Sequence, residues 1–188
     1  MGCETVRMSA VEITMILAVL LLVIAIVLFN RLVRDRNRVR AAWSDIDVQL
    51  TRRHELVPRL VEAVKAYAGH ERATLEAVTE LRRQSTAVSR LADKAGLEDQ
   101  LEQGVQKLIV LAEDYPDLKA SQNFIELQHE LMEIEDHLQY ARRFYNGAVR
   151  ILNTRVETVP DVIIARLFNY QPAEYFEADH RAAPELAL

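Results

Sequence analysis

The chain has 188 residues, half of them apolar, and a formal net charge of −5. The negative balance argues against a nucleic-acid-binding surface, and a single cysteine, Cys3, excludes an intramolecular disulfide framework. Only five glycines and five prolines interrupt the chain, and this scarcity predicts an all-α fold.

The N-terminal part is dominated by an apolar run from Ile13 to Phe29. As a helix this run covers about 25 Å, and flanking residues extend it toward the roughly 30 Å of a bilayer's hydrocarbon core. We therefore predict a short N-terminal segment over 1–10 and a transmembrane anchor over 11–33. A cleavable signal peptide is the alternative, but the run lacks a basic leader region and a small-residue cleavage pattern.

A cluster of arginines follows the apolar run, whereas Arg7 alone precedes it. The cluster consists of Arg31, Arg34, Arg36, Arg38 and Arg40. Positive charge favours the cytoplasmic side, so we expect the N-terminus outside and the rest of the chain in the cytoplasm. The cluster also predicts a membrane-proximal basic site facing anionic lipid headgroups, and a stop-transfer signal alone is the simpler alternative.

Beyond the anchor, two long stripes of apolar residues recur at helical spacing. The first contains Val39, Trp43, Ile46, Leu50, Val57, Leu60, Val64 and Tyr67, with Arg53 in the one position where an apolar residue is missing. The second contains Phe124, Leu127, Leu131, Ile134, Leu138, Ala141, Tyr145, Ala148 and Leu152. Shorter stripes run from Leu75 to Val88 and from Leu101 to Tyr115. Together they predict an antiparallel up-and-down four-helix bundle over 34–159, with two long and two shorter helices.

Turn signals separate these stripes. Gly69 is expected to end the first helix, the segment from Asp93 to Gly96 to separate the two shorter helices, and Asp117 to cap the fourth. Pro58 lies inside the first stripe and lacks the N–H that would bond the carbonyl of His54. We expect a bend there without a break, serving either as a hinge or as simple curvature around the core.

Three segments of this sequence carry a resemblance to a known family. They are RNRVRAAWSDIDVQLTRRHELVPRLVEAVKAYAGHE (36–71), AEDYPDLKASQNFIELQHEL (112–131) and YARRFYNGAVRILNTRVETVP (140–160). In these segments the chain resembles the LemA family. The resemblance implies a bacterial cell-membrane protein with one N-terminal anchor and a helical bundle, in a family without an established biochemical activity.

The C-terminal region over 160–178 is expected to form a short helix followed by an aromatic tail, and we expect 179–188 to be disordered. Four aromatic side chains gather there: Phe168, Tyr170, Tyr175 and Phe176. They are candidate partner-binding residues, because such a density of aromatic surface is buried against something. Burial against the chain's own bundle is the alternative.

Catalytic and metal-binding patterns are weak. The five histidines complete no H-E-x-x-H motif, and the spacing from Glu126 to His129 that di-metal bundles use occurs once within the predicted bundle. We therefore expect no catalytic residue, metal, cofactor or small-molecule substrate, and no enzyme. A di-metal carboxylate enzyme is kept as a minor alternative.

What the sequence offers is surface for association. We predict a non-enzymatic scaffold or adaptor that binds other membrane or envelope proteins through the bundle. A self-assembling, membrane-organising protein, as a homo-oligomer on the bilayer, is the second hypothesis. Five amides on the fourth helix could either fix helix register or mark a docking face. They are Asn123, Gln128, Gln139, Asn146 and Asn153.

Overall fold

The computed structural model describes residues 10–177, so the outermost N-terminal residues and the expected disordered segment 179–188 lie outside the described range. Within that range all regular structure is helical. The helices are α1 (Ala10–Tyr67), α2 (Arg72–Ala87), α3 (Leu91–Leu111), a 3₁₀ turn (Ala112–Asp114), α4 (Pro116–Lys119), α5 (Gln122–Glu157) and α6 (Asp161–Leu167). The all-α class is confirmed.

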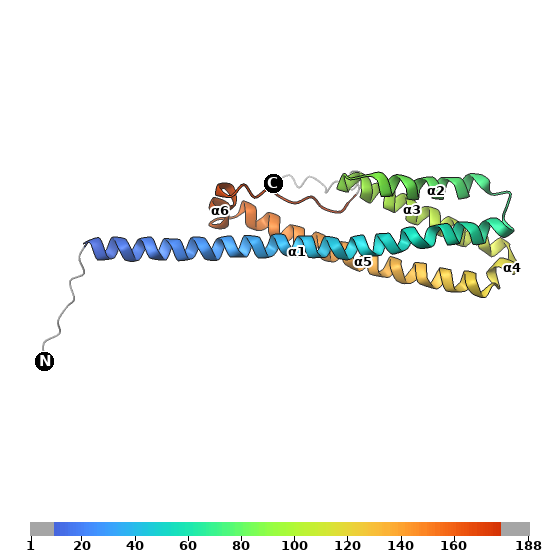
Figure 1. Ribbon diagram of the computed structural model, residues 1–188, viewed down its shortest axis with the longest axis horizontal. Coiled ribbons are helices and arrows are strands. Elements are labelled where there is room, and N and C mark those ends of the chain that lie inside the picture. Colours follow the sequence, from blue (N-terminus) through green and yellow to red (C-terminus); the bar gives the residue numbers. More distant parts are fainter. Residues whose placement is uncertain (1–9, 178–188) are drawn as a thin grey trace, which may run out of the picture.

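Helix α1 has 58 residues and is about 87 Å long. Its first third is mainly exposed and apolar, whereas a buried stripe begins at Leu28 and continues to Val64. Figure 1 shows α1 extending alone beyond the other helices at its N-terminal end. Within the described residues it is the one helix long and apolar enough to cross a membrane. Pro58 lies inside this helix without breaking it, as expected.

Helices α1 and α5 pack along each other in opposite directions (Figure 1). The register is visible in three contacts: Asp35 with Arg155, Trp43 with Tyr145, and Arg53 with Glu135. Both apolar stripes predicted from the sequence lie mainly in the shared core, although Tyr67 is exposed and Leu127 and Trp43 are half-buried. The 3-4 spacing therefore identified the packing faces of both long helices.

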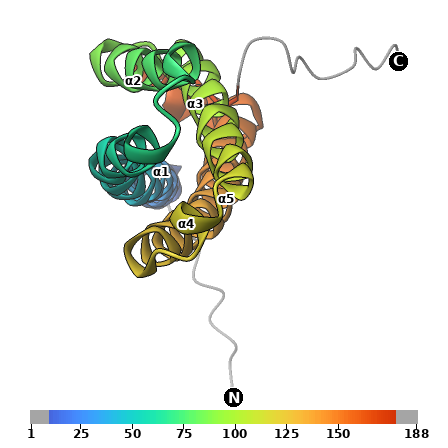
Figure 2. The ribbon, with the colours of Figure 1, turned by 90° about the vertical axis from the view of Figure 1, so that its right-hand side faces the viewer.

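Helices α2 and α3 form a hairpin on one side of the long pair, as the end-on view in Figure 2 shows. They approach each other closely at Gly104. A Cβ atom built at Gly104 would lie 2.8 Å from Cγ2 of Val78, a distance that real side chains do not adopt. The absence of a side chain at Gly104 thus sets the separation of the two helices.

Three details of the predicted bundle were wrong. The described chain has one short helix that was not predicted, α4, so the count of four helices over 34–159 was too low, whereas the short helix expected within 160–178 is present as α6. Helix α3 already begins at Leu91, because Asp93 lies in its first turn, where a carboxylate is favourable, and Gly96 is tolerated within it. Helix α5 begins at Gln122 with Ser121 at its N-cap, whereas the predicted cap Asp117 lies inside α4, which begins at Pro116.

Candidate functional site

We call the packed helices beyond the apolar run of α1 the helical domain. A buried ionic cluster joins α1, α2, α3 and α5 in the half of this domain that lies away from the apolar run. Glu98 on α3 is fully buried, and Arg53 on α1 is 3% exposed. The Nη1 atom of Arg53 lies 3.7 Å from Oε2 of Glu98 and donates to its backbone carbonyl at 3.2 Å. The Nη2 atom of Arg53 lies 3.5 Å from Oε2 of Glu135 on α5. Arg53 therefore ties three helices together at the position where its apolar stripe is interrupted.

Two further side chains donate to Glu98. His54 Nε2 lies 2.7 Å from Oε1 of Glu98, and the Ser85 hydroxyl bonds the same oxygen. Burial by itself would raise the pKa of Glu98, but the bond from His54, the charge of Arg53 and the bond from Ser85 together lower it. The Glu98 carboxylate is thus held ionised inside the helical domain, and its charge is shared among neighbours from two other helices.

A second junction forms where the C-terminal segment, residues 168–177, runs back along α5. The Nδ2 atom of Asn153 donates to the carbonyl of Ala173 at 2.9 Å, and the N–H of Ala173 donates to Oδ1 of Asn153 at 2.8 Å. Asn146 and Phe176 repeat this two-way pairing at 3.3 and 2.8 Å. Asn146 and Asn153 are seven residues apart on a helix, and Ala173 and Phe176 are three residues apart in an extended segment. Both intervals span about 10 Å, so the spacing of the two asparagines matches that of their partners.

Aromatic contacts anchor the end of this segment. The ring of Phe176 is 4% exposed and lies 5.8 Å from that of Trp43 on α1. The hydroxyl of Tyr145 donates to the carbonyl of Glu174 at 2.9 Å. Burial and the nearby charge of Glu174 raise the pKa of Tyr145. The tail residue Phe176 is therefore part of the core in this arrangement.

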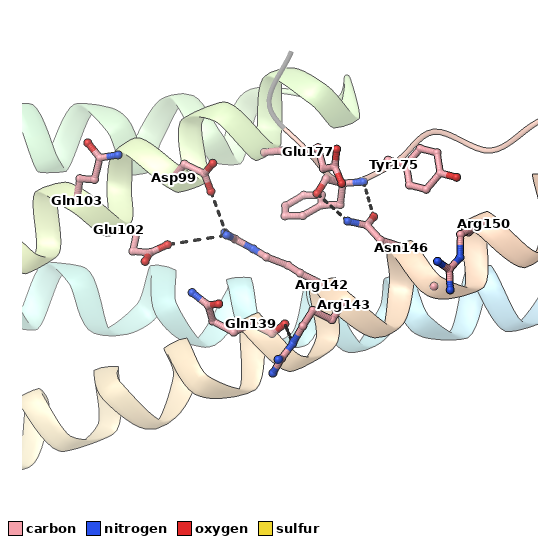
Figure 3. A pocket seen from close by; sticks show the side chains of 13 residues that line it. Asp99, Glu102, Gln103, Gln139, Arg142, Arg143, Asn146, Arg150, Tyr175 and Glu177 are labelled. Atoms are coloured by element: carbon pink, nitrogen blue, oxygen red, sulfur yellow. Dashed lines mark hydrogen bonds and ion pairs between the residues drawn. The ribbon is translucent and has the colours of Figure 1, made fainter. Parts of the chain in front are cut away.

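An open groove of about 780 Å³ lies between α3, α5 and the C-terminal segment (Figure 3). Arg142 crosses it from α5: its Nη1 lies 3.0 Å from Asp99 and 3.8 Å from Glu102, both on α3. The Arg142 guanidinium also lies 5.2 Å from the centre of the Phe176 ring. The groove therefore links three segments through Arg142, and Arg143 and Arg150 of α5 also line it.

A third feature is an exposed apolar face along α1 and α5. Val48 on α1 and Tyr140 and Phe144 on α5 are 49%, 68% and 48% exposed. They line a shallow cleft of about 250 Å³. Sequence reasoning missed this face because it followed only the two buried stripes. Apolar residues outside those stripes, Tyr140 and Phe144 above all, were the available signal.

The predicted site residues are distributed as follows. The five arginines of the basic cluster, 31, 34, 36, 38 and 40, are all exposed on the stretch of α1 that follows the apolar run. Phe168 and Tyr175 are 54% and 40% exposed, and Tyr170 is half-buried. Of the predicted partner-binding residues, only Phe176 is fully buried against the chain itself.

The metal alternative gains no support from the geometry. Glu126 and His129 are both exposed on α5. Among residues 10–177 no three histidine, cysteine or acidic side chains gather in a way that could hold a metal ion. The Glu-x-x-His spacing therefore points away from the interior that a di-metal bundle would use.

The fold and these sites define an all-helical protein in which a long apolar helix continues into an ion-paired helical domain. A model of the LemA family matches residues 42–187. Protein LemA from Metamycoplasma hominis is 26% identical to this chain over 152 residues, which cover 79% of this chain and 68% of that protein. Because the family match covers well over half of the sequence, the chain belongs to the LemA family.

Proposed function

We propose that this chain is a membrane-anchored scaffold that binds other membrane or envelope proteins at the cytoplasmic face of a bacterial membrane, without catalysis. The observation that carries the proposal is the continuity of α1. One helix runs from the exposed apolar run into the core of the helical domain without a linker. A domain attached in this way has a fixed direction relative to the bilayer.

Packing against α5 supports the stiffness of this arrangement. The part of α1 after Arg31 extends about 55 Å to Tyr67. Ion pairs at two levels hold α5 against it, with Asp35 bound to Arg155 at 2.5 Å near the start of this part and Arg53 close to Glu135 further along. The helical domain is therefore a rod that projects its side surfaces well beyond the lipid headgroups. A rod of this kind suits a protein that presents docking sites to neighbours.

The exposed face formed by Val48, Tyr140 and Phe144 is the proposed docking site. Its two aromatic side chains flank a cleft, and large aromatic residues contribute disproportionately to protein interfaces. Asp45 and His137 line the same cleft and supply polar groups at its edge. This combination of an apolar centre and a polar rim is typical of a non-obligate protein interface.

Site-specific photo-crosslinking in intact cells tests this function. A photoreactive residue is placed at Phe144, and a matched control at Gln106, which is exposed on α3. We expect discrete adducts with other membrane proteins from position 144, lost when Tyr140→Asp is added, and retained when Ile125→Asp is added elsewhere on α5. Equal adduct patterns at positions 144 and 106 would contradict the proposal.

Self-assembly is the second candidate function, and one observation favours it. Exposed apolar residues recur along a single side of α5, and this row can pair with the same row of a second copy. The row comprises Met132, Tyr140, Phe144 and Ile151. In the same crosslinking experiment, an adduct with the mass of two chains as the dominant product would favour assembly over recruitment.

A further inference from the structure

We infer that α6 and the turn before it insert an apolar face into the bilayer leaflet at which the helical domain sits, as a second membrane contact beside the α1 span. The inference rests on the proposed membrane anchor. It concerns an exposed apolar surface formed by Val159, Ile163, Leu167 and Phe168, of which the sequence had singled out Phe168 alone, as a candidate partner-binding residue. We call these four residues the α6 patch.

The α6 patch is large, apolar and outward-facing. Its members are 79%, 64%, 74% and 54% exposed, in chain order. Ile163 and Leu167 are four residues apart in α6, which places them on one side of the helix, while Val159 lies in the turn before it. The opposite side is fixed, because Ile164 and Ala165 are buried against the rest of the domain. The exposed side is therefore a defined face.

An ion pair network holds α6 in this orientation. Arg155 near the end of α5 lies 2.5 Å from Asp35 on α1 and 3.5 Å from Asp161, the first residue of α6. Asp35 and Asp161 are both buried. Because one guanidinium engages both carboxylates, α6 is tied to α1 and α5 together. The patch has a fixed place at the end of the domain.

That place is the level at which the apolar run of α1 ends. The ring centres of Phe168 and Phe29 lie 4.7 Å apart, and Phe29 is the last residue of the run before Asn30 and Arg31. If the run spans a bilayer, Phe29 lies near the boundary between hydrocarbon and headgroups, and Phe168 lies at the same depth. Figure 1 shows α6 at the end of the helical domain from which α1 emerges alone.

Basic and aromatic residues around the patch fit the same boundary. Arg166 is exposed on α6, and Arg31 and Arg34 are exposed on the adjoining turns of α1. The Tyr170 ring lies 6.4 Å from that of Phe29. The Arg36 guanidinium lies 5.3 Å from the centre of the Tyr170 ring. Apolar side chains rimmed by arginine match an interfacial helix on an anionic leaflet. The bilayer around the span is thus the occupant of the patch.

Depth-dependent fluorescence quenching tests this inference on the full chain. Cys3→Ser removes the native thiol, and single cysteines at Ile163, Ile24 or Gln106 carry an environment-sensitive dye. The proteins are reconstituted into vesicles of phosphatidylcholine and phosphatidylglycerol that contain nitroxide-labelled lipids. We expect blue-shifted emission and loss of signal by quenching at position 163 and at the span position 24, but not at the distal position 106.

The outcomes separate this inference from the anchor on which it rests. Quenching at 24 without quenching at 163 overturns the α6 contact and keeps the span. Quenching at 163 alone supports the contact and overturns the span, and quenching at neither position overturns both. A blue shift at 163 that nitroxide lipids do not quench indicates burial against protein, which in these vesicles is a second copy of the chain, and also overturns the inference.

A substitution in the patch supplies a second readout. Leu167→Asp changes a residue that is 74% exposed, so the helical domain is expected to keep its fold. It should reduce quenching at position 163, whereas Val110→Asp, at an exposed apolar residue of α3, should leave it unchanged. Unaltered quenching at 163 in the Leu167→Asp variant would contradict the insertion of this face.

Discussion

The Nε atom of Arg82 on α2 donates to the backbone carbonyl of His54 on α1 at 2.6 Å. Pro58 occupies the position whose N–H would otherwise bond that carbonyl, so a proline in one helix is compensated by a side chain from another. His54 in turn bonds Glu98 through its ring. The hydrogen bond that α1 lacks at Pro58 is therefore replaced at the place where the α2–α3 hairpin packs against α1.

This relationship predicts coupling between positions 82 and 58. Arg82→Met should lower the free energy of unfolding by about 1–3 kcal/mol, because it leaves a partly buried carbonyl unpaired. In the Pro58→Ala background the alanine N–H can donate to the His54 carbonyl. There Arg82→Met should lower the free energy of unfolding by at least about 0.5 kcal/mol less than in the unsubstituted chain. Urea unfolding in mild detergent, followed by circular dichroism, measures both. Equal costs in the two backgrounds would refute the compensation.

Glu98 predicts an acid-sensitive component of stability. Its pKa is lowered in the folded chain, below the roughly 4.3 of an unfolded glutamate. A lowered pKa means that the contribution is complete above about pH 5 and is lost as the pH falls through the folded value. Glu98→Gln should cost about 1–3 kcal/mol at neutral pH, since the buried Arg53 keeps only its contact with Glu135 while His54 and Ser85 lose a charged acceptor, and should flatten the acid dependence of the melting temperature.

The control for this prediction is Glu55→Gln, which changes an exposed carboxylate on the same stretch of α1. The melting temperature of Glu55→Gln should change with pH in the same way as that of the unsubstituted chain across the acid range. Parallel pH curves for the unsubstituted chain and Glu98→Gln would show that the buried carboxylate is not the acid-sensitive group.

Gly104 and Gly147 give a matched pair of substitutions. A Cβ at Gly104 would meet Val78 at 2.8 Å, so Gly104→Ala should destabilise the chain by about 1–3 kcal/mol through forced separation of α2 and α3. A Cβ at Gly147 meets nothing within 4 Å. Gly147→Ala should therefore stabilise α5 by about 0.5–1 kcal/mol through helix propensity. Thermal melts of both variants check the opposite signs, and a Gly104→Ala melt at or above that of the unsubstituted chain would disprove the close approach.

The asparagine pairing predicts how the C-terminal segment detaches. Asn153→Ala removes both bonds to Ala173, and Asn146→Ala removes both bonds to Phe176. Each change should raise the rate of proteolytic cleavage within 168–177, and the double variant should raise it further, because the main chain of the segment loses its partners. Mass spectrometry of limited digests provides the measurement.

Asn123→Ala is the control for the segment, because Asn123 is an exposed amide near the start of α5. Its cleavage pattern should match that of the unsubstituted chain. If the Asn146 and Asn153 variants also match it, the segment is held by its aromatic contacts and the amides are incidental.

The helices were predictable because their signals are local. Apolar spacing identified the packing faces of α1 and α5, and the same spacing puts Arg53 on the buried face of α1. Its partner was missed, although Glu98 lies three residues before Leu101 and so continues the apolar stripe of α3. Opposite charges at two core positions were the signal, and only the packing of α3 against α1 brings them together.

The roles of the amides and of α6 depended on tertiary contacts. Nothing in the sequence distinguishes Asn146 and Asn153, which bind the C-terminal segment, from the exposed Asn123 on the same helix. The short helix α6 was expected, but its exposed side is defined only by burial of Ile164 against the domain. Long-range packing therefore decided which polar and apolar residues face inward.

The most direct test of the account concerns the span itself, through the accessibility of two cysteines in intact cells. A membrane-impermeant maleimide is applied to the chain with its native Cys3, and to a Cys3→Ala variant carrying Gln106→Cys, each beside a permeabilised control. The account predicts labelling of Cys3 in intact cells and labelling of position 106 only after permeabilisation. Labelling of both positions in intact cells, or of neither, would place them on one side of the membrane and contradict a single span that holds the helical domain at the cytoplasmic face.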